Sequence, residues 1–157
     1  MTRFSSFAQT LQASDIAELL ALTEKPEVIS FAGGLPAPEL FPIEEMKKVD
    51  EAIYNEEGRK AVQYGTTEGY VPLREEICKR MKDKFFVDCK PEDVVVTTGS
   101  QQALFILAQI LVDKDQTILM ESPSYMGAIM AFDPVGPRYT EVPTDDQGIV
   151  PEELEKI

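Results

Sequence analysis

The chain has 157 residues, 43% of them hydrophobic, which is enough for a globular core. It carries 15 basic and 28 acidic residues, a net charge of −13, and no histidine. This balance leaves no basic stripe for nucleic acid, and the lack of histidine excludes Ser-His-Asp and Cys-His catalysis within the chain. No apolar run approaches the roughly 20 residues of a membrane span, and no secretory signal opens the chain, so we expect a cytoplasmic protein.

The first part of the chain predicts two helices joined by irregular segments. Residues 14–22 form a short amphipathic pattern, with Ser14 as a plausible N-cap. Residues 28–32 are a short extended run that ends at Gly33-Gly34, and the three prolines of residues 35–42 indicate a stiff connector. Pro42 suits the first position of a helix that continues to about Asn55, and Gly58 marks its exit.

The remaining residues alternate between strand and helix patterns. After a Gly-bracketed loop at 63–70, we predict a helix over 72–86, strands at 94–96, 117–120 and 139–142, and helices after Gly99, over 126–132 and from Pro151. The helix after Gly99 is apolar on most faces, which predicts burial on both sides. Residues 94–120 have the length of a right-handed parallel crossover.

This alternation predicts an α/β fold with a mainly parallel sheet and flanking helices. Such a sheet needs both faces covered, yet roughly three candidate strands are present and the last helix is cut short. We therefore expect the chain to be the N-terminal part of a longer protein.

The turn Thr98-Gly99-Ser100-Gln101 joins a predicted strand to a predicted helix. The free N–H groups of a helix start and the helix dipole favour an anion at such a junction. Gly99 permits close approach, and Ser100 offers a hydroxyl. A plain helix N-cap is the alternative interpretation of the turn.

A second turn, Ser122-Pro123-Ser124-Tyr125, follows the next predicted strand. In an open α/β sheet, ligands bind beyond the carboxyl ends of the strands, so the two turns are expected to converge. Tyr125 is then placed to stack on a planar ring, although a half-buried packing role is the alternative. Gly33-Gly34 and Tyr64-Gly65 are weak signals, since a glycine pair often only ends a strand and Tyr64 can simply pack.

The two cysteines, Cys78 and Cys89, fit no metal-binding spacing and make no disulfide framework. We expect reduced thiols that are buried or idle, and no metal site.

Five segments, in this order, resemble the N-terminal part of fold-type I pyridoxal-phosphate aminotransferases of class I/II. The closest subgroup is the 2-aminoadipate and multi-substrate aminotransferases, which share sequence with the catalytic domain of MocR-type regulators. Any one segment is modest support, whereas five in family order are highly specific and cover nearly all of the chain. The segments are ISFAGGLPAPELFP (29–42), QYGTTEGYVPLREEI (63–77), VVVTTGSQQAL (94–104), ESPSYMGAIMAF (121–132) and VPTDDQGI (142–149).

The resemblance implies a site for pyridoxal 5'-phosphate. It assigns the cofactor phosphate to Gly99, Ser100 and Gln101, and the stacking face to Tyr125. It places the Gly34 backbone beside the substrate carboxylate and brings Tyr64 across a homodimer interface to the partner's cofactor phosphate. It also implies a cis bond before Pro123, an arm and small-domain segment over residues 1–42, and the start of the cofactor-binding large domain over residues 43–157.

The chain departs from the family pattern in its catalytic residues. The family's Schiff-base lysine lies in an S-x-S-K-type segment far downstream, as do the acid that pairs with the pyridine nitrogen and the arginine that binds the α-carboxylate. No catalytic residue is therefore assigned here. Ala17 also stands where many relatives have an arginine that helps to recognise acidic side chains. The lysines present lack the family context: Lys25, Lys47, Lys48, Lys60, Lys79, Lys82, Lys84, Lys90, Lys114 and Lys156.

The resemblance implies an aminotransferase that acts on an L-amino acid and a 2-oxo acid, in amino-acid metabolism and biosynthesis. One alternative keeps the fold and changes the reaction, to a β-lyase or a decarboxylase. The other is the ligand-sensing domain of a MocR-like regulator, which the acidic charge and the absence of a winged helix before Met1 disfavour. We expect no nucleic-acid or membrane partner.

Overall fold

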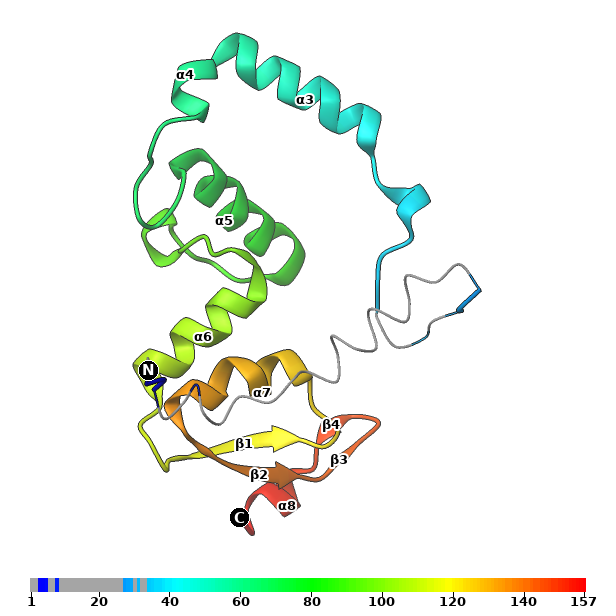
Figure 1. Ribbon diagram of the computed structural model, residues 1–157, viewed down its shortest axis with the longest axis vertical. Coiled ribbons are helices and arrows are strands. Elements are labelled where there is room, and N and C mark those ends of the chain that lie inside the picture. Colours follow the sequence, from blue (N-terminus) through cyan, green and yellow to red (C-terminus); the bar gives the residue numbers. More distant parts are fainter. Residues whose placement is uncertain (1–2, 6–7, 9–26, 30, 32–33) are drawn as a thin grey trace. The chain divides into compact units, whose positions relative to one another are not determined.

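Figure 1 shows the computed structural model, which describes residues 3–5, 8, 27–29, 31 and 34–157. Backbone contacts divide the chain into two compact units, Met1–Tyr64 and Gly65–Ile157. The helix predicted over residues 14–22, with Ala17, lies outside the described residues. The boundary expected after residue 42 stays a prediction, because a division by contacts measures compactness and not family domains.

The described part of the first unit is mainly helical. A 3-10 turn, η1 (Pro38–Leu40), lies in the proline-rich connector, and α3 (Ile43–Glu56) and α4 (Gly58–Ala61) follow. Pro42 is the residue before α3, with φ −81° and ψ 62°, so the helix starts one residue later than predicted. Glu44 and Glu45 occupy its first turn, where the positive end of the helix dipole favours negative charge.

The second unit contains the α/β alternation that the sequence predicts. Its helices α5 and α7 and its strands β1 and β2 lie within one or two residues of the predicted bounds. In chain order the elements are α5 (Val71–Phe85), η2 (Pro91–Asp93), α6 (Gly99–Leu111), β1 (Thr117–Glu121), α7 (Met126–Phe132), η3 (Asp133–Val135), β2 (Arg138–Val142), β3 (Thr144–Asp145), β4 (Gly148–Ile149) and α8 (Pro151–Leu154).

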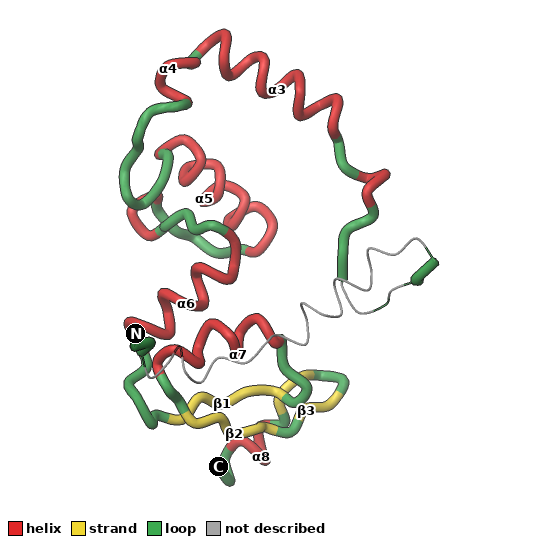
Figure 2. The backbone as a smooth tube through the Cα atoms, in the orientation of Figure 1, coloured by secondary structure: helices red, strands yellow, loops and turns green. Residues whose placement is uncertain are grey.

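The second unit contains a parallel β-α-β crossover (Figure 2). β1 pairs in parallel with β2, from Thr117 opposite Arg138 to Glu121 opposite Val142, and α7 connects the two strands. Val142 is 1% exposed and Ala131 of α7 is 3% exposed, so strand and helix each contribute a residue to the small core. β3 and β4 form a separate antiparallel hairpin.

The predicted strand at residues 94–96 is wrong. These residues belong to no strand, although the backbone at Val94 is extended. The N–H of Val96 donates to the Glu68 carbonyl at 2.9 Å, and a Cβ on Gly69 would lie 2.8 Å from Val96, so this segment packs on a loop. The predicted crossover from 94 to 120 is wrong as well, because its first strand does not form.

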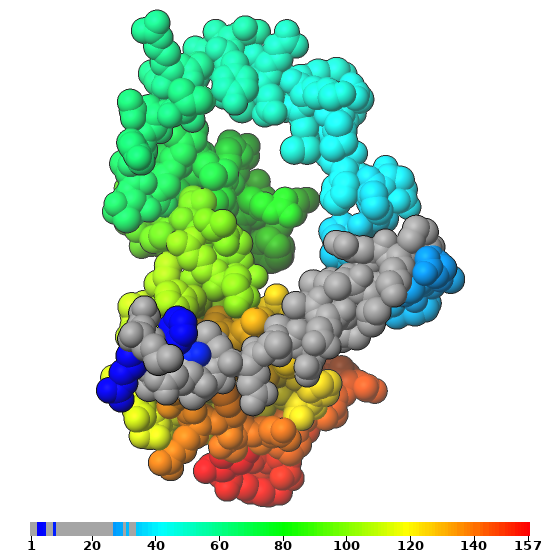
Figure 3. All heavy atoms as spheres, viewed as in Figure 1, coloured from blue at the N-terminus to red at the C-terminus, as the bar shows by residue number. Residues whose placement is uncertain are grey.

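The expected burial of α6 on both sides is also wrong. Ala108 is its one buried residue, and its larger apolar side chains are exposed. The atoms of this helix are lime green in the space-filling view (Figure 3). α7 is the main element that packs against α6 within the described residues, so the other apolar faces have no cover there. The exposed side chains are Phe105, Ile106, Leu107, Ile110 and Leu111. No helix in the described part of the chain is long and apolar enough to cross a membrane.

Tyr139 ties β2 to the end of α7. Its hydroxyl donates to the Asp133 carboxylate at 2.8 Å and lies 3.2 Å from the Ile129 carbonyl oxygen. Burial raises the pKa of Tyr139 well above its ordinary value, and the hydrogen bond to Asp133 and its negative charge add to the shift. The phenol is therefore neutral at physiological pH and keeps its proton for the hydrogen bond.

We expect Tyr139→Phe to lower the free energy of unfolding by about 1 kcal/mol at neutral pH, because one hydrogen bond is lost. The folded-state pKa is raised, so this contribution is fully present below the unfolded tyrosine pKa. It is lost as pH rises above about 10, where the unfolded state ionises first. Urea titrations of both proteins from neutral pH to above about pH 10 check the prediction. A stability advantage of the wild type over the variant that increases as pH rises would contradict it.

Candidate functional site

The turn before α6 depends on glycine and is open to solvent. Gly99 has φ +70°, a left-handed conformation that side chains rarely adopt, and a Cβ built on it would meet nothing within 4 Å. Its N–H donates to the Thr97 carbonyl at 2.9 Å, and the Thr97 hydroxyl donates to the Gly99 carbonyl at 3.0 Å. The turn is thus held in shape by its own backbone and leaves free space beside Gly99.

The first turn of α6 presents amide groups to this free space. Thr98 is the N-cap residue, yet its side chain makes no capping hydrogen bond, and the Gln102 side chain instead accepts from the Thr98 N–H at 2.5 Å. Thr98 therefore provides no side-chain cap, and the anion-binding role of the turn stays a prediction. Ser100 and Gln101 are exposed and lie inside the helix, where the N–H groups of the first turn have no intrahelical acceptor. This geometry suits an anion.

A hydrogen bond joins this turn to the start of α7. The side-chain amide of Gln101 donates to the Gly127 carbonyl at 2.8 Å. Tyr125, the N-cap residue of α7, lies over the same glycine, since a Cβ on Gly127 would come 2.5 Å from Cζ of the ring. The structure thus brings together Gln101 and Tyr125, as the convergence of the two turns predicts.

The turn before α7 has the predicted conformation. The Ser122–Pro123 peptide bond is cis, which confirms that expectation. The Ser124 hydroxyl donates to the Glu121 carbonyl and closes the turn. Tyr125 is 65% exposed, so although its ring contacts Gly127, most of it remains accessible to a ligand.

Gly127 is a site residue that the sequence analysis did not single out. A glycine inside a predicted helix, two positions after an aromatic residue, is a signal for close approach of another group. Here that group is the Tyr125 ring, which occupies the place of the missing side chain.

Gly34 and Tyr64 belong to the first unit. Gly34 is exposed, has φ +58°, and a Cβ there would meet nothing within 4 Å. Tyr64 is 99% exposed, so simple packing does not explain it. The roles of both residues stay predictions.

Comparison with known proteins identifies the family. Residues 27–156 match the model of the family described as aminotransferase class I and II. The chain therefore belongs to the class I and II aminotransferases, and the predicted family and α/β fold class are confirmed.

Several individual aminotransferases are similar to this chain over nearly its whole length. The chain is 46% identical over 154 residues to 2-aminoadipate transaminase of Thermus thermophilus, covering 98% of this chain and 37% of the relative. It superposes with a TM-score of 0.89 and 37% identity on kynurenine aminotransferase of Pyrococcus horikoshii in complex with PMP, over 98% of this chain and 38% of that one. It also matches an α-aminoadipate aminotransferase of Thermus thermophilus complexed with N-(5'-phosphopyridoxyl)-L-leucine, with a TM-score of 0.81, 45% identity and coverage of 98% and 36%.

The chain spans little more than a third of the length of these relatives. The chain is also similar, at lower identity, to a regulatory protein. The probable rhizopine catabolism regulatory protein MocR of Rhizobium meliloti is 31% identical over 125 residues, which is 78% of this chain and 25% of that protein.

We expect Gly127→Ala to displace the Tyr125 ring, because the new Cβ would lie 2.5 Å from Cζ. A crystal structure of the variant, or the NMR shifts of the Tyr125 ring protons, measures this movement. Gly58→Ala is the matched control, since a Cβ there meets nothing within 4 Å. A ring that stays in place in the Gly127 variant would contradict the close approach.

Proposed function

We propose that the full-length protein is a pyridoxal-phosphate-dependent aminotransferase that moves an amino group from an L-amino acid to a 2-oxo acid. The observation that carries the proposal is the hydrogen bond of Gln101 to Gly127, which sets the anion-binding turn of α6 beside the exposed ring of Tyr125. A phosphate and an aromatic ring are the two parts of this cofactor that a protein must hold.

The residues at the α6 turn fit a phosphate group. The space beside Gly99 admits the phosphate oxygens, and the first-turn N–H groups and the positive end of the helix dipole stabilise their charge. The exposed Ser100 hydroxyl adds a donor at the same place. Gln101 contributes its backbone N–H, because its side chain is already bonded to Gly127.

Tyr125 fits the pyridine ring of the cofactor. An exposed aromatic ring fixed at the start of α7 offers a flat stacking surface, and such contacts contribute about 0.5–1.5 kcal/mol beyond area burial. When bound, the cofactor supplies an electron-withdrawing ring that stabilises negative charge at the amino-acid α-carbon. The residues of this chain hold its phosphate and fix the plane of its ring.

The remaining expectations belong to the same proposal. We place the lysine that takes the α-proton outside this sequence, since the ten lysines here lack the family segment. Gly34 lies at the substrate carboxylate, and Tyr64 reaches the partner's cofactor phosphate in a homodimer. The protein works in the cytoplasm, in amino-acid biosynthesis, and has no nucleic-acid or membrane partner.

A ligand-sensing role is the second candidate, and the similarity to MocR favours it specifically. A ligand-sensing domain would use the same proposed cofactor site, so cofactor binding does not separate the two functions. The higher identity to a named transaminase, 46% against 31%, favours catalysis. Conversion of a 2-oxo acid to its amino acid by the purified full-length protein, without binding to DNA, distinguishes catalysis from sensing. Product analysis of the same reaction separates transamination from β-elimination and decarboxylation.

We expect Ser100→Ala in the full-length protein to weaken cofactor binding about tenfold or more, because a hydrogen bond to a charged phosphate contributes roughly 1.5–3 kcal/mol. Equilibrium dialysis against pyridoxal phosphate measures the change. Thr144→Ala removes an exposed hydroxyl in the β3–β4 hairpin and should leave the affinity unchanged. Equal affinities for the Ser100 variant and the wild type would remove Ser100 from the site.

We also expect the 157-residue chain by itself to show no transaminase activity and no cofactor fixed to a lysine by borohydride, because it lacks the family's lysine segment. Activity assays and peptide mass spectrometry of the reduced chain test this. Activity, or a modified lysine at the site, would overturn the assignment of the lysine to another segment.

A further inference from the structure

The chain reverses direction at the end of α5. Phe86 adopts the left-handed conformation, with φ 58°, and its N–H donates to the Lys82 carbonyl. The N–H of Val87 donates back to the Met81 carbonyl at 3.2 Å. The Phe86 bond is the 5→1 bond of an αL C-cap, which ends the helix, and the Val87 bond holds the chain where it turns back.

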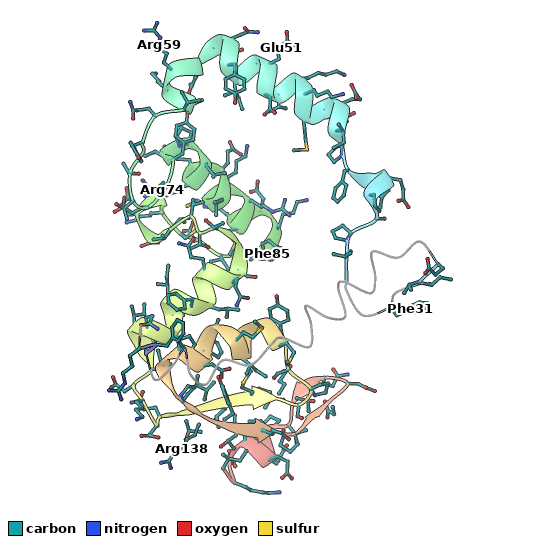
Figure 4. The ribbon with its side chains drawn as sticks, in the orientation of Figure 1. Phe31, Glu51, Arg59, Arg74, Phe85 and Arg138 are labelled. Atoms are coloured by element: carbon teal, nitrogen blue, oxygen red, sulfur yellow. The ribbon has the colours of Figure 1, made fainter. Side chains whose placement is uncertain are left out.

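The returning segment follows one stripe of α5. Lys82 lies 3.3 Å from the Asp88 carboxylate, and the Arg74 guanidinium donates to the Pro91 carbonyl at 2.9 Å. Lys82 and Arg74 are two helical turns apart, and residue 78 lies midway between them on the same stripe. Figure 4 labels Arg74 near one end of α5 and Phe85 at the other.

The two cysteines of the chain meet between these fixed points. Cys78 lies on the stripe between Lys82 and Arg74, and Cys89 lies on the return between Asp88 and Pro91. Both are free thiols and partly buried, and they are close enough for Cys89 to raise the pKa of Cys78. Residues eleven positions apart are thus held opposite each other by the helix reversal and by the bonds on either side.

We propose that Cys78 and Cys89 form a reversible disulfide that closes the reversal after α5. With a small-molecule disulfide RSSR as oxidant, a thiolate attacks one sulfur and releases RS⁻. The thiolate of the second cysteine then attacks the sulfur of the first cysteine in this mixed disulfide and releases the second RS⁻. In sum, two thiols and RSSR give the Cys78–Cys89 disulfide and two RSH, so two electrons pass to the oxidant.

The surroundings make this pair slow to react and stable once reduced. Burial raises the pKa of the Cys78 thiol above its ordinary value, and the contact with Cys89 and the charges of Asp93 and Glu92 add to it. The thiolate is the attacking species, so exchange should be faster in alkaline buffer. Lys82 is paired with Asp88, and the negative charge of Asp88 offsets the stabilisation that the Lys82 ammonium would give to a thiolate.

The bond links α5 to the segment that leads to the α6 turn. A disulfide that closes a short loop shifts the folding equilibrium by about a hundredfold in the chain-entropy model. Opening of the reversal should become rarer by a comparable factor when the disulfide is formed.

The test treats the folded full-length protein with oxidised glutathione, blocks free thiols, and digests with trypsin without reduction. The expected product is peptide 75–79 joined to peptide 85–114, which dithiothreitol separates. Hydrogen exchange of the Phe86 and Val87 amides should slow at least tenfold in the oxidised form. Mixed glutathione disulfides on both cysteines, or two unmodified thiols at alkaline pH, would overturn the proposal.

The single variants provide matched controls. Cys78→Ser should leave Cys89 to accumulate a mixed glutathione disulfide, and Cys89→Ser should do the same for Cys78. Neither variant should show slower exchange at Phe86 and Val87 after oxidation. The same slowing in a single variant would show that the change does not come from the linked pair.

Discussion

The candidate site depends on one hydrogen bond, from the Gln101 side chain to the Gly127 carbonyl. The turn of α6 can receive an anion without it, and Tyr125 can present a ring without it, but a ligand that needs both requires a fixed separation between them. Gly127 serves twice, because its carbonyl accepts the bond and its missing side chain leaves room for the Tyr125 ring. The proposed cofactor would therefore meet an anion-suited turn and an exposed ring that are already assembled, which would lower the entropy lost on binding.

Local chemistry in the sequence was sufficient to predict α3, the α-helices of the second unit, two strands and the two turns. Helix 126–132 was predicted at its observed bounds, and the cis bond before Pro123 followed from the family resemblance. Long-range partners could not be predicted in this way. An apolar run such as 94–96 indicates burial, but strand pairing also needs a neighbour, and the structure gives Val96 a loop carbonyl instead. Hydrophobic periodicity does not predict the Gln101–Gly127 bond either, because this bond joins a side chain to the backbone 26 positions away.

Within the second unit, the β1-α7-β2 crossover and the reversal after α5 are stabilised by different interactions. The β1-α7-β2 crossover combines a small core with the bond from Tyr139 to Asp133. The α5 reversal instead relies on backbone capping and on polar contacts spaced along one helix stripe. Arg74, 9% exposed, is the buried charge in that second arrangement, and its Nε has no partner within the described residues. Polar bonds, with little apolar burial, therefore position the segment that leads into the α6 turn.

The exposed face of α6 has a consequence for the behaviour of the polypeptide in solution. Ile110 and Leu111 are 67% and 70% exposed, and the water that covers such surface is released when another apolar surface meets it. Copies of the chain therefore attract each other at short range through this helix. The net charge of −13 opposes that approach at longer range. Because salt screens the repulsion and leaves the apolar attraction intact, the colloidal stability of the chain falls as ionic strength rises.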